Sequence, residues 1–227
     1  MRIQRLCTAH DHHGRLALGL YACPLSEELP REKRHTHAHF AALELLSAAL
    51  AEDWGLHHCR MVRDAKGKPM LVCSGVYVNL SHSRNMAVCG IALTPLGVDC
   101  EGPRQVKSAT VQRVCAESEQ QLLLQSGEPA YDFARLWTLK EAYGKCTGEG
   151  IRMPLAHAEF DFSHETLRFL HTQKEAYGFL QLLLPEKTVV SVCMQQPFSP
   201  MKIHCREGIS VMGSESFPRG VFCYAAD

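Results

Sequence analysis

Apolar and polar positions follow two spacings along the chain, and together they predict a mixture of strands and helices. Short apolar runs bounded by turn residues predict buried strands at 16–22, 76–80 and 86–92. A helical spacing of apolar residues predicts one long helix between them, starting near Ser26 and ending at Gly55. The segment 66–69 reads as a turn, and 94–97 marks the first boundary between structural units.

The second stretch of the chain repeats this order of elements. It predicts a short strand at 97–101 and helices near 107–126 and 131–147, the last of them stopped by the glycines at 148–150. Further strands, mostly antiparallel, are predicted at 158–162, 167–170, 177–184 and 189–194. Beyond Pro197 the periodicity fades, which predicts a loosely packed tail. The pattern thus predicts an α/β (α+β) protein with two similar halves and mostly antiparallel sheets.

Composition excludes some classes of protein. The chain has 227 residues, 46% apolar and 21% charged, which is ordinary globular composition and argues against disorder. At roughly 150 residues per domain, the length corresponds to about 1.5 domains. Zero formal charge argues against a surface that attracts nucleic acid as a whole. Divided after Pro95, the chain has 11 basic and 8 acidic residues (+3), then 13 and 16 (−3).

Cysteine usage and the apolar runs indicate a compartment. The N-terminus lacks the apolar stretch of a secretory signal, and no run reaches the roughly 18 apolar residues of a membrane span. The eleven cysteines are an odd number without a Cys-x-x-Cys pair. We therefore expect reduced cysteines in the core of a cytoplasmic protein that has no membrane partner.

Two groups of residues could carry chemistry. Asp99 and Glu101 stand two apart on a predicted strand, so their carboxylates point to the same side and could bind one hard cation. Glu141 and Lys145 lie one turn apart on a predicted helix, a spacing that is also typical of a solvated surface pair. Trp137, one turn earlier on the same stripe, places both charges beside a large apolar ring and favours a functional role.

Basic and hydroxyl side chains suited to phosphate oxygens lie elsewhere in the chain. They are Arg31, Lys33 and Arg34 at the start of the first helix, Lys66 and Lys68 in the turn, and the loop Ser81-His82-Ser83. Mg²⁺ is usually bound by one or two carboxylates together with substrate phosphates, so both groups could share one ligand. Alternatively, each basic residue is simply solvated in its own loop.

Four motifs in order resemble those of one known family. The motifs are Lys66-Gly67-Lys68-Pro69, Asn79-Leu80-Ser81-His82-Ser83, Gly97-Val98-Asp99-Cys100-Glu101 and Trp137-Thr138-Leu139-Lys140-Glu141-Ala142-Tyr143-Gly144-Lys145 with Gly148-Glu149-Gly150. The chain thus resembles 4′-phosphopantetheinyl transferases of the surfactin-synthetase-activating type, over roughly residues 26–195. The resemblance implies a single-chain pseudo-dimer of two α/β halves with the active site between them, at 1–95 and 96–196, followed by a tail of unknown role at 197–227.

The resemblance also implies the reaction and its residues. Phosphopantetheine would pass from coenzyme A to a serine of an apo acyl or peptidyl carrier protein, with Mg²⁺, in a monomeric enzyme. By position, the metal ligands are Asp99, Glu101 and Glu141; the coenzyme A contacts are Lys68, Ser81, His82 and Lys145, with Arg31 and Arg34 for the 3′-phosphate. Glu141 can take the serine proton, either directly or through a metal-bound water, and Lys145 meets the pyrophosphate.

The sequence departs from the family pattern in two helices. The family commonly has a Phe-Phe pair before an acidic residue after the Asp-x-Glu motif, where this chain has Arg113-Val114-Cys115-Ala116-Glu117. It also commonly has an arginine just before the Leu-Leu pair of the first long helix, where this chain has Leu43-Glu44-Leu45-Leu46.

Two other functions remain open from the sequence. A relative that binds coenzyme A or carrier proteins without catalysis would share the motifs. A His/Cys metal-binding module would use the histidine groups at 10–13 and 35–39, although neither has a partner at zinc spacing.

Overall fold

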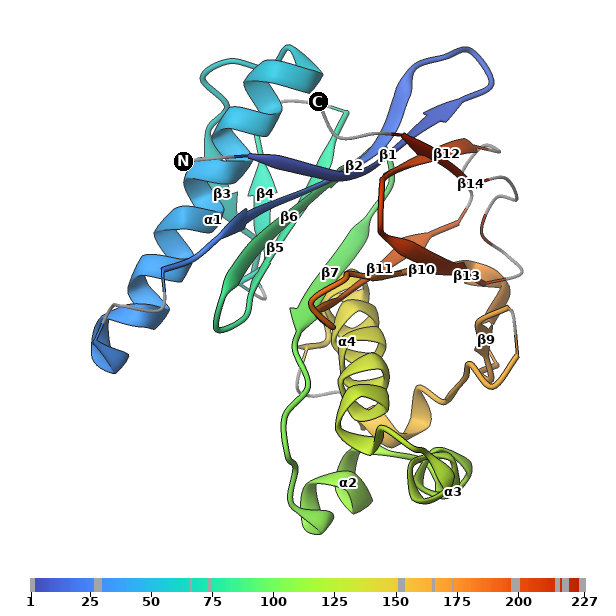
Figure 1. Cartoon of the computed structure of the whole chain (residues 1–227). Coiled ribbons are helices and arrows are strands. Elements are labelled where there is room, and N and C mark those ends of the chain that lie inside the picture. Colours follow the sequence, from blue (N-terminus) through green and yellow to red (C-terminus); the bar gives the residue numbers. More distant parts are fainter. Residues whose placement is uncertain are drawn as a thin grey trace.

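Two sheets lie face to face, and each carries a long helix on its outer side (Figure 1). The computed structural model describes residues 3–26, 30–65, 67–72, 75–150, 154–164, 166–172, 174–196, 201–214, 217 and 221–224. Nearly all strand pairs are antiparallel; β12 with β14 is parallel. The predicted α/β class with mostly antiparallel sheets is confirmed. None of the helices in these ranges combines the length and the apolar character needed to cross a bilayer.

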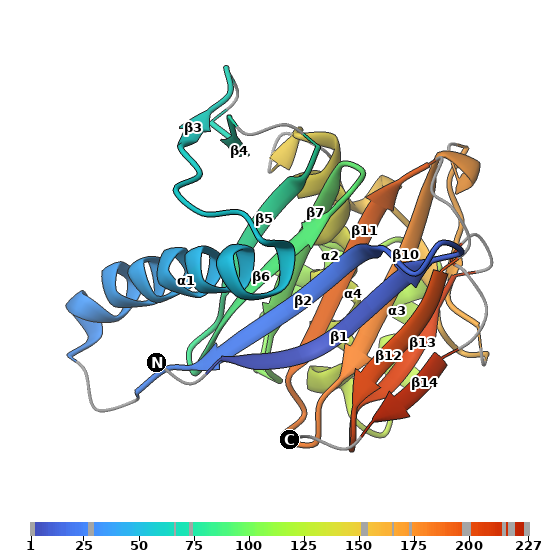
Figure 2. The same cartoon turned by 90° about the horizontal axis from the view of Figure 1, so that it is seen from above.

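The first sheet is built mainly from the N-terminal half. Its order is β14 (Val221–Tyr224), β12 (Met201–Arg206), β1 (Gln4–Asp11), β2 (Leu16–Pro24), β6 (Met86–Ala92) and β5 (Tyr77–His82). The long helix α1 (Arg31–Trp54) packs on its outer face, as Figure 2 shows from above. A hairpin of β3 (Met61–Arg63) and β4 (Pro69–Leu71) lies next to β5.

The second sheet carries the helices of the C-terminal half. Its order is β13 (Ser210–Gly213), β10 (Tyr177–Leu183), β11 (Val189–Gln195) and β7 (Leu96–Glu101). The helices are α2 (Ser108–Val114), α3 (Glu117–Gln125) and α4 (Pro129–Thr147), and α4 packs on β7 and β11. Short elements complete this half: β8 (Phe160–Asp161), β9 (Arg168–Phe169), and single turns at Leu155–His157 and Lys174–Ala176.

Alternation along the strands separates the core from the site. Leu96, Val98 and Cys100 of β7 point into the apolar core between the two sheets. Because successive side chains of a strand point to opposite faces, Asp99 and Glu101 lie on the other face, where α4 packs. The period of two therefore keeps both carboxylates out of the core and turns them toward the second half's long helix.

Several predicted elements differ from the observed ones. The helix predicted at 107–126 is interrupted, because Cys115 and Ala116 adopt extended backbone between α2 and α3. Helix α1 begins at Arg31 rather than near Ser26, since the residue before Pro30 is disfavoured in helical geometry. Glu27 and Glu28, part of the predicted helix start, lie outside the described residues. Strands β1, β3 and β4 were not predicted.

The prediction of a loosely packed tail is wrong. Strand β12 pairs with β1 in the first sheet, while β13 pairs with β10 in the second. Ile203 and Cys205 of β12 are buried in the core between the sheets, together with Ile209 and Phe217. The segment beyond residue 200 thus connects both halves, so the chain does not fall into two halves and a free end.

Candidate active site between the two halves

The candidate site forms where the edge strands of the two sheets approach each other. Strand β5 ends the first sheet and β7 ends the second. Their contact is polar: the side-chain oxygen of Asn79 accepts a hydrogen bond from the backbone N–H of Val98 at 2.9 Å, and the Ser81 hydroxyl donates to Asp99 Oδ1 at 2.7 Å. These bonds place Ser81 of the first half directly against the predicted metal ligand of the second.

Helix α4 brings Glu141 and Lys145 to the same place. It lies so close to β7 that a Cβ at Gly97 would overlap with the Ala142 carbonyl oxygen and the Cys146 amide nitrogen. Glycine in a strand often marks such a close backbone approach. The missing side chain therefore sets the distance from Asp99 to the residues of α4.

Lys145 pairs with Asp99, whereas the sequence suggested a pair with Glu141. Its Nζ donates to Asp99 Oδ1 at 2.7 Å, to the Val98 carbonyl at 3.0 Å and to the Ser81 hydroxyl at 3.1 Å. Asp99 is buried, with 7% of its surface exposed. The ammonium thus supplies the positive charge that a buried carboxylate requires.

Burial and the negative charge of Asp99 both raise the pKa values of the two other carboxylates, Glu141 and Glu101. Burial raises the pKa of Glu141 above its usual value, and the negative charge of Asp99 raises it further, while Lys145 opposes both. Burial also raises the pKa of Glu101, with a smaller contribution from Asp99; Arg104 and the Gly102 N–H act against it. Carboxylate oxygens of this type are the ligands that Mg²⁺ prefers.

In this structure the side chains of Asp99, Glu101 and Glu141 are not close enough together to bind one metal ion. Across the described ranges, no three His, Cys, Asp or Glu side chains converge closely enough to hold a metal as they stand. The carboxylate chemistry fits a hard divalent cation, and Lys145 compensates for the charge of Asp99 where such a cation would act.

His82 lies at the end of β5, beside the first turns of α1. Its ring meets that of His35 edge to face, with ring centroids 4.9 Å apart. Burial lowers the pKa of His82, and the charges of His35 and Lys145 lower it further. The sequence offered His35 only as part of the alternative metal-binding run His35-x-His37-x-His39, not as a neighbour of the coenzyme A contact His82.

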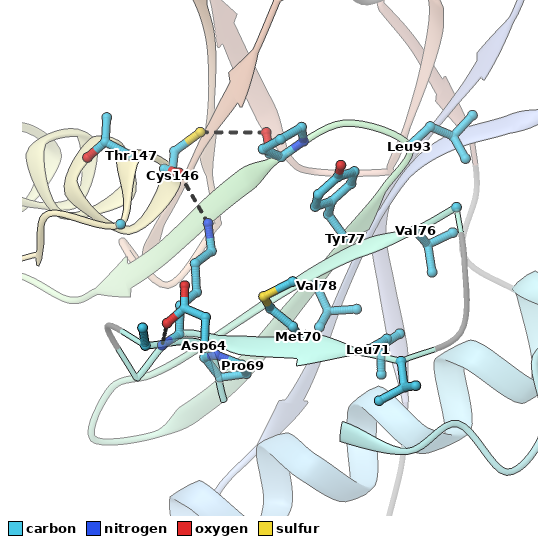
Figure 3. A pocket seen from close by; sticks show the side chains of 16 residues that line it. Asp64, Pro69, Met70, Leu71, Val76, Tyr77, Val78, Leu93, Cys146 and Thr147 are labelled. Carbon is cyan, nitrogen blue, oxygen red and sulfur yellow. Dashed lines mark hydrogen bonds between the residues drawn. The ribbon is translucent and has the colours of Figure 1, made fainter. Parts of the chain in front are cut away.

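Lys68 lies at one end of the groove between the halves. Figure 3 shows a pocket of about 700 Å³ lined by apolar side chains such as Met70, Leu71 and Tyr77. The Lys68 Nζ reaches across it and donates to the carbonyls of Leu96 and Cys146, both at 3.1 Å. Burial lowers the pKa of Lys68. This predicted coenzyme A contact therefore also ties the β3–β4 hairpin to the second half.

The predicted 3′-phosphate ligands begin α1. Arg31 is the first residue of the helix, but its side chain lies outside what the structure describes. Arg34 is half-buried one turn later, next to His35. Both residues belong to the helix whose His35 ring contacts that of His82.

Two charged groups near the site were missed from the sequence. Arg104 lies 3.7 Å from Glu101 and 5.7 Å over the Trp137 ring, which explains why this tryptophan is near the carboxylates. Glu119 forms a fully buried ion pair with Lys140, the residue before Glu141. From the sequence, Glu117 was the acidic residue named in this helix. In the structure α3 starts only after the extended residues Cys115 and Ala116, and Glu119 is the acidic residue that is buried.

Comparisons with known proteins agree on one type of protein. A family model described as the 4′-phosphopantetheinyl transferase superfamily matches residues 95–193. The 4′-phosphopantetheinyl transferase HetI of Nostoc sp. is 34% identical over 185 residues, covering 74% of this chain and 77% of HetI. The 4′-phosphopantetheinyl transferase gsp of Aneurinibacillus migulanus is 30% identical over 56% of this chain and 54% of its own length. The 4′-phosphopantetheinyl transferase Sfp of Bacillus subtilis is 29% identical over 39% of this chain and 41% of its own length.

Proposed function

The chain belongs to the 4′-phosphopantetheinyl transferase superfamily, and from this premise we propose the residues that perform the transfer. The enzyme moves 4′-phosphopantetheine from coenzyme A to a serine of an apo carrier protein, leaving 3′,5′-ADP. The observation that supports our assignment is the junction of Asp99, Ser81 and Lys145, because it joins motifs from both halves at one point.

We assign the metal site to Asp99, Glu101 and Glu141. Mg²⁺ bound there would neutralise the pyrophosphate of coenzyme A. Lys145 and His82 supply a positive charge and a hydrogen-bond donor for the pyrophosphate oxygens. Lys68, which lines the pocket beside the β3–β4 hairpin, and Ser81, at the β5–β7 junction, are assigned to coenzyme A, with Arg31 and Arg34 for its 3′-phosphate.

Glu141 is assigned as the general base. The carrier serine oxygen attacks the phosphorus that bears the pantetheine arm, and the bond from this phosphorus to the bridging oxygen breaks, so that 3′,5′-ADP leaves with the bonding electrons. The serine proton passes to the Glu141 carboxylate. A positioned carboxylate can accept a proton in this way.

The assignment is tested by incubating the enzyme with Mg²⁺, coenzyme A and a panel of apo acyl and peptidyl carrier proteins, and measuring the mass of each carrier. We expect at least one carrier to gain phosphopantetheine. Glu141→Gln should slow transfer by about 100-fold or more, the usual contribution of a general base. Glu186→Gln, at an exposed glutamate in the β10–β11 turn, is the matched control.

Two results would contradict the proposal. If Glu141→Gln transfers as fast as the wild-type enzyme, Glu141 is not the general base. If no carrier gains the mass while coenzyme A binds, a binding protein without catalysis would be the better description.

We further propose that the enzyme acts as a cytoplasmic monomer. Both sides of the groove come from one chain, so a second copy is not needed to complete the site. Nine cysteines within the described ranges are free thiols, as expected in a reducing compartment. Light scattering of the purified protein tests the monomer directly.

A further inference from the structure

Glu119 of α3 and Lys140 of α4 form an ion pair with no exposed side-chain surface. Lys140 Nζ lies 2.8 Å from Glu119 Oε2 and donates to the carbonyls of Leu155 at 3.0 Å and Ala158 at 2.6 Å. The ammonium has three hydrogens, and these partners use all of them. The lysine is thus fully satisfied inside the protein.

The carboxylate of Glu119 is equally well occupied. Its Oε1 accepts from the backbone N–H of Phe160 at 2.8 Å, and its Oε2 accepts from that of Ala116 at 2.7 Å. Glu119 therefore joins the start of its own helix to β8, and through Lys140 to α4. Six polar groups from four segments meet in one closed network.

Stability alone gives no reason for this arrangement. Moving two charges out of water costs about as much as their attraction returns, and apolar residues of similar size are often as stable or more so. The surrounding side chains of this region are apolar and aromatic, and the Phe160 ring lies 5.9 Å from Lys140 Nζ. What the network specifies is geometry, because its hydrogen bonds are all made in one rotational setting of α4.

Lys140 and Glu141 are neighbours, so they point about 100° apart around the helix axis. Glu141 lies one turn before Lys145, whose Nζ donates to Asp99 Oδ1 at 2.7 Å, so when Lys140 is fixed toward α3 and Ala158, Glu141 is on the face of α4 that is turned toward β7. On its other side α4 is in close backbone contact with Gly97. The helix is therefore held between β7 and the buried pair.

We propose that Glu119 and Lys140 are positioning residues of the transfer reaction, which fix the rotation of α4 so that Glu141 faces the carboxylates of β7. The inference rests on the proposed role of Glu141 in the site. Neither residue touches a substrate; they act through the helix. Misplacing a reacting group by about 1 Å can cost about 100-fold in rate.

The test replaces the pair by apolar residues in the double variant Glu119→Leu/Lys140→Met. Because no charge is left unpaired, we expect the double variant to stay folded, with a lower Tm than the wild-type protein because the carbonyls of Leu155 and Ala158 lose their donor. Mn²⁺ affinity, measured by electron paramagnetic resonance without substrates, should fall by about tenfold or more, as for other groups that orient metal ligands. The kcat of transfer should fall by a similar factor, with a smaller change in the KM for coenzyme A.

The matched control removes the exposed ion pair of Glu128 and Lys187 by Glu128→Gln/Lys187→Met, which should change neither readout. If the apolar double variant does not fold, Glu119→Gln replaces it, since this change keeps the shape of the side chain; the same fall in Mn²⁺ affinity is expected.

Mn²⁺ affinity decides the inference separately from the proposed function. Equal Mn²⁺ affinity in the folded variant and the wild-type protein overturns the positioning role, whatever the transfer rate. If the wild-type protein binds Mn²⁺ but modifies no carrier, the proposed function is wrong. The Mn²⁺ affinities of the variant and the wild-type protein then still test the positioning role of Glu119 and Lys140.

Discussion

At the scale of single residues, the motifs predicted which side chains gather but not how they pair. Asp99, Ser81 and Lys145 were singled out by spacing and by resemblance, and all three are in contact. Helical spacing suggested that Lys145 pairs with Glu141. Lys145 is instead bonded to Asp99, because the close approach of α4 to β7 offers a more buried carboxylate. That choice depends on tertiary contacts, which periodicity does not contain.

The raised pKa of Glu141 predicts an effect on stability. In the unfolded chain a glutamate titrates near pH 4.3, and in the fold Glu141 titrates higher. The folded state therefore binds the extra proton, and stability falls as pH rises through the interval between these values. Above both pKa values the charged carboxylate is destabilising, so Glu141→Gln should raise the Tm at pH 7 in metal-free buffer.

The expected result is a higher Tm for Glu141→Gln than for the wild-type protein at pH 7. Thermal unfolding in the presence of EDTA at pH 4, 5, 6 and 7 measures it. The difference from wild type should vanish below pH 4, where both states are protonated. An unchanged or lower Tm of the variant at pH 7 would argue against strain at Glu141; the exposed Glu186→Gln serves as control.

Replacing Lys68 should lower both the stability of the protein and its affinity for coenzyme A. In Lys68→Met the carbonyls of Leu96 and Cys146 lose their donor, and an unsatisfied buried group costs about 1–3 kcal/mol. We expect a lower free energy of unfolding in denaturant titration, together with a higher KM for coenzyme A. Lys174→Met, at an exposed lysine, should show neither effect. A variant with full stability would mean that the hairpin does not depend on this tether.

At the scale of elements, the sequence predicted the long helices and the central strands, and erred where tertiary contacts decide. Continuous helical spacing from 107 to 126 concealed the extended residues Cys115 and Ala116. That interruption lets Glu119 cap α3 through the Ala116 N–H and also reach Lys140. The sequence comparison with the family named only Glu117 in this helix, so spacing did not point to Glu119.

The contact of α4 with β7 makes Gly97 the most sensitive position of the second half. Gly97→Ala places a methyl group against the α4 backbone, which cannot rotate away as a side chain can. Overpacking of this kind costs about 1–3 kcal/mol and shifts the helix. We expect a lower free energy of unfolding in urea and slower transfer, because Glu141 and Lys145 move with α4.

The matched variant is Gly127→Ala, where the added methyl group would meet open space. Its stability and transfer rate should equal those of the wild-type protein. If Gly97→Ala were equally neutral, the distance between α4 and β7 would not control the site.

At the scale of the whole molecule, the zero net charge divides between the two halves. The half with the excess of basic residues contains Lys68, Ser81 and His82, and the half with the excess of acidic residues contains the three carboxylates. Their meeting at the β5–β7 junction was implied by the family resemblance. The role of the final segment was not, because glycine and proline residues beyond Pro197 obscured the alternation of Met201, Ile203 and Cys205 with polar residues.

Strand β12 should therefore contribute strongly to the stability of both halves. Ile203 is 1% exposed, pairs with Ala9 of β1 and packs with residues of β10 and β11 in the core between the sheets. Ile203→Ala removes buried methyl and methylene groups and leaves a cavity, at a cost of about 2–5 kcal/mol. The neighbouring Lys202 is exposed on the same strand, so Lys202→Ala should have little effect.

Urea unfolding tests this prediction with a separate probe in each half, the fluorescence of Trp54 and of Trp137 in single-tryptophan variants. Both transitions should move together for Ile203→Ala. A shift at Trp54 alone would mean that β12 stabilises only its own sheet, and that the two halves unfold independently.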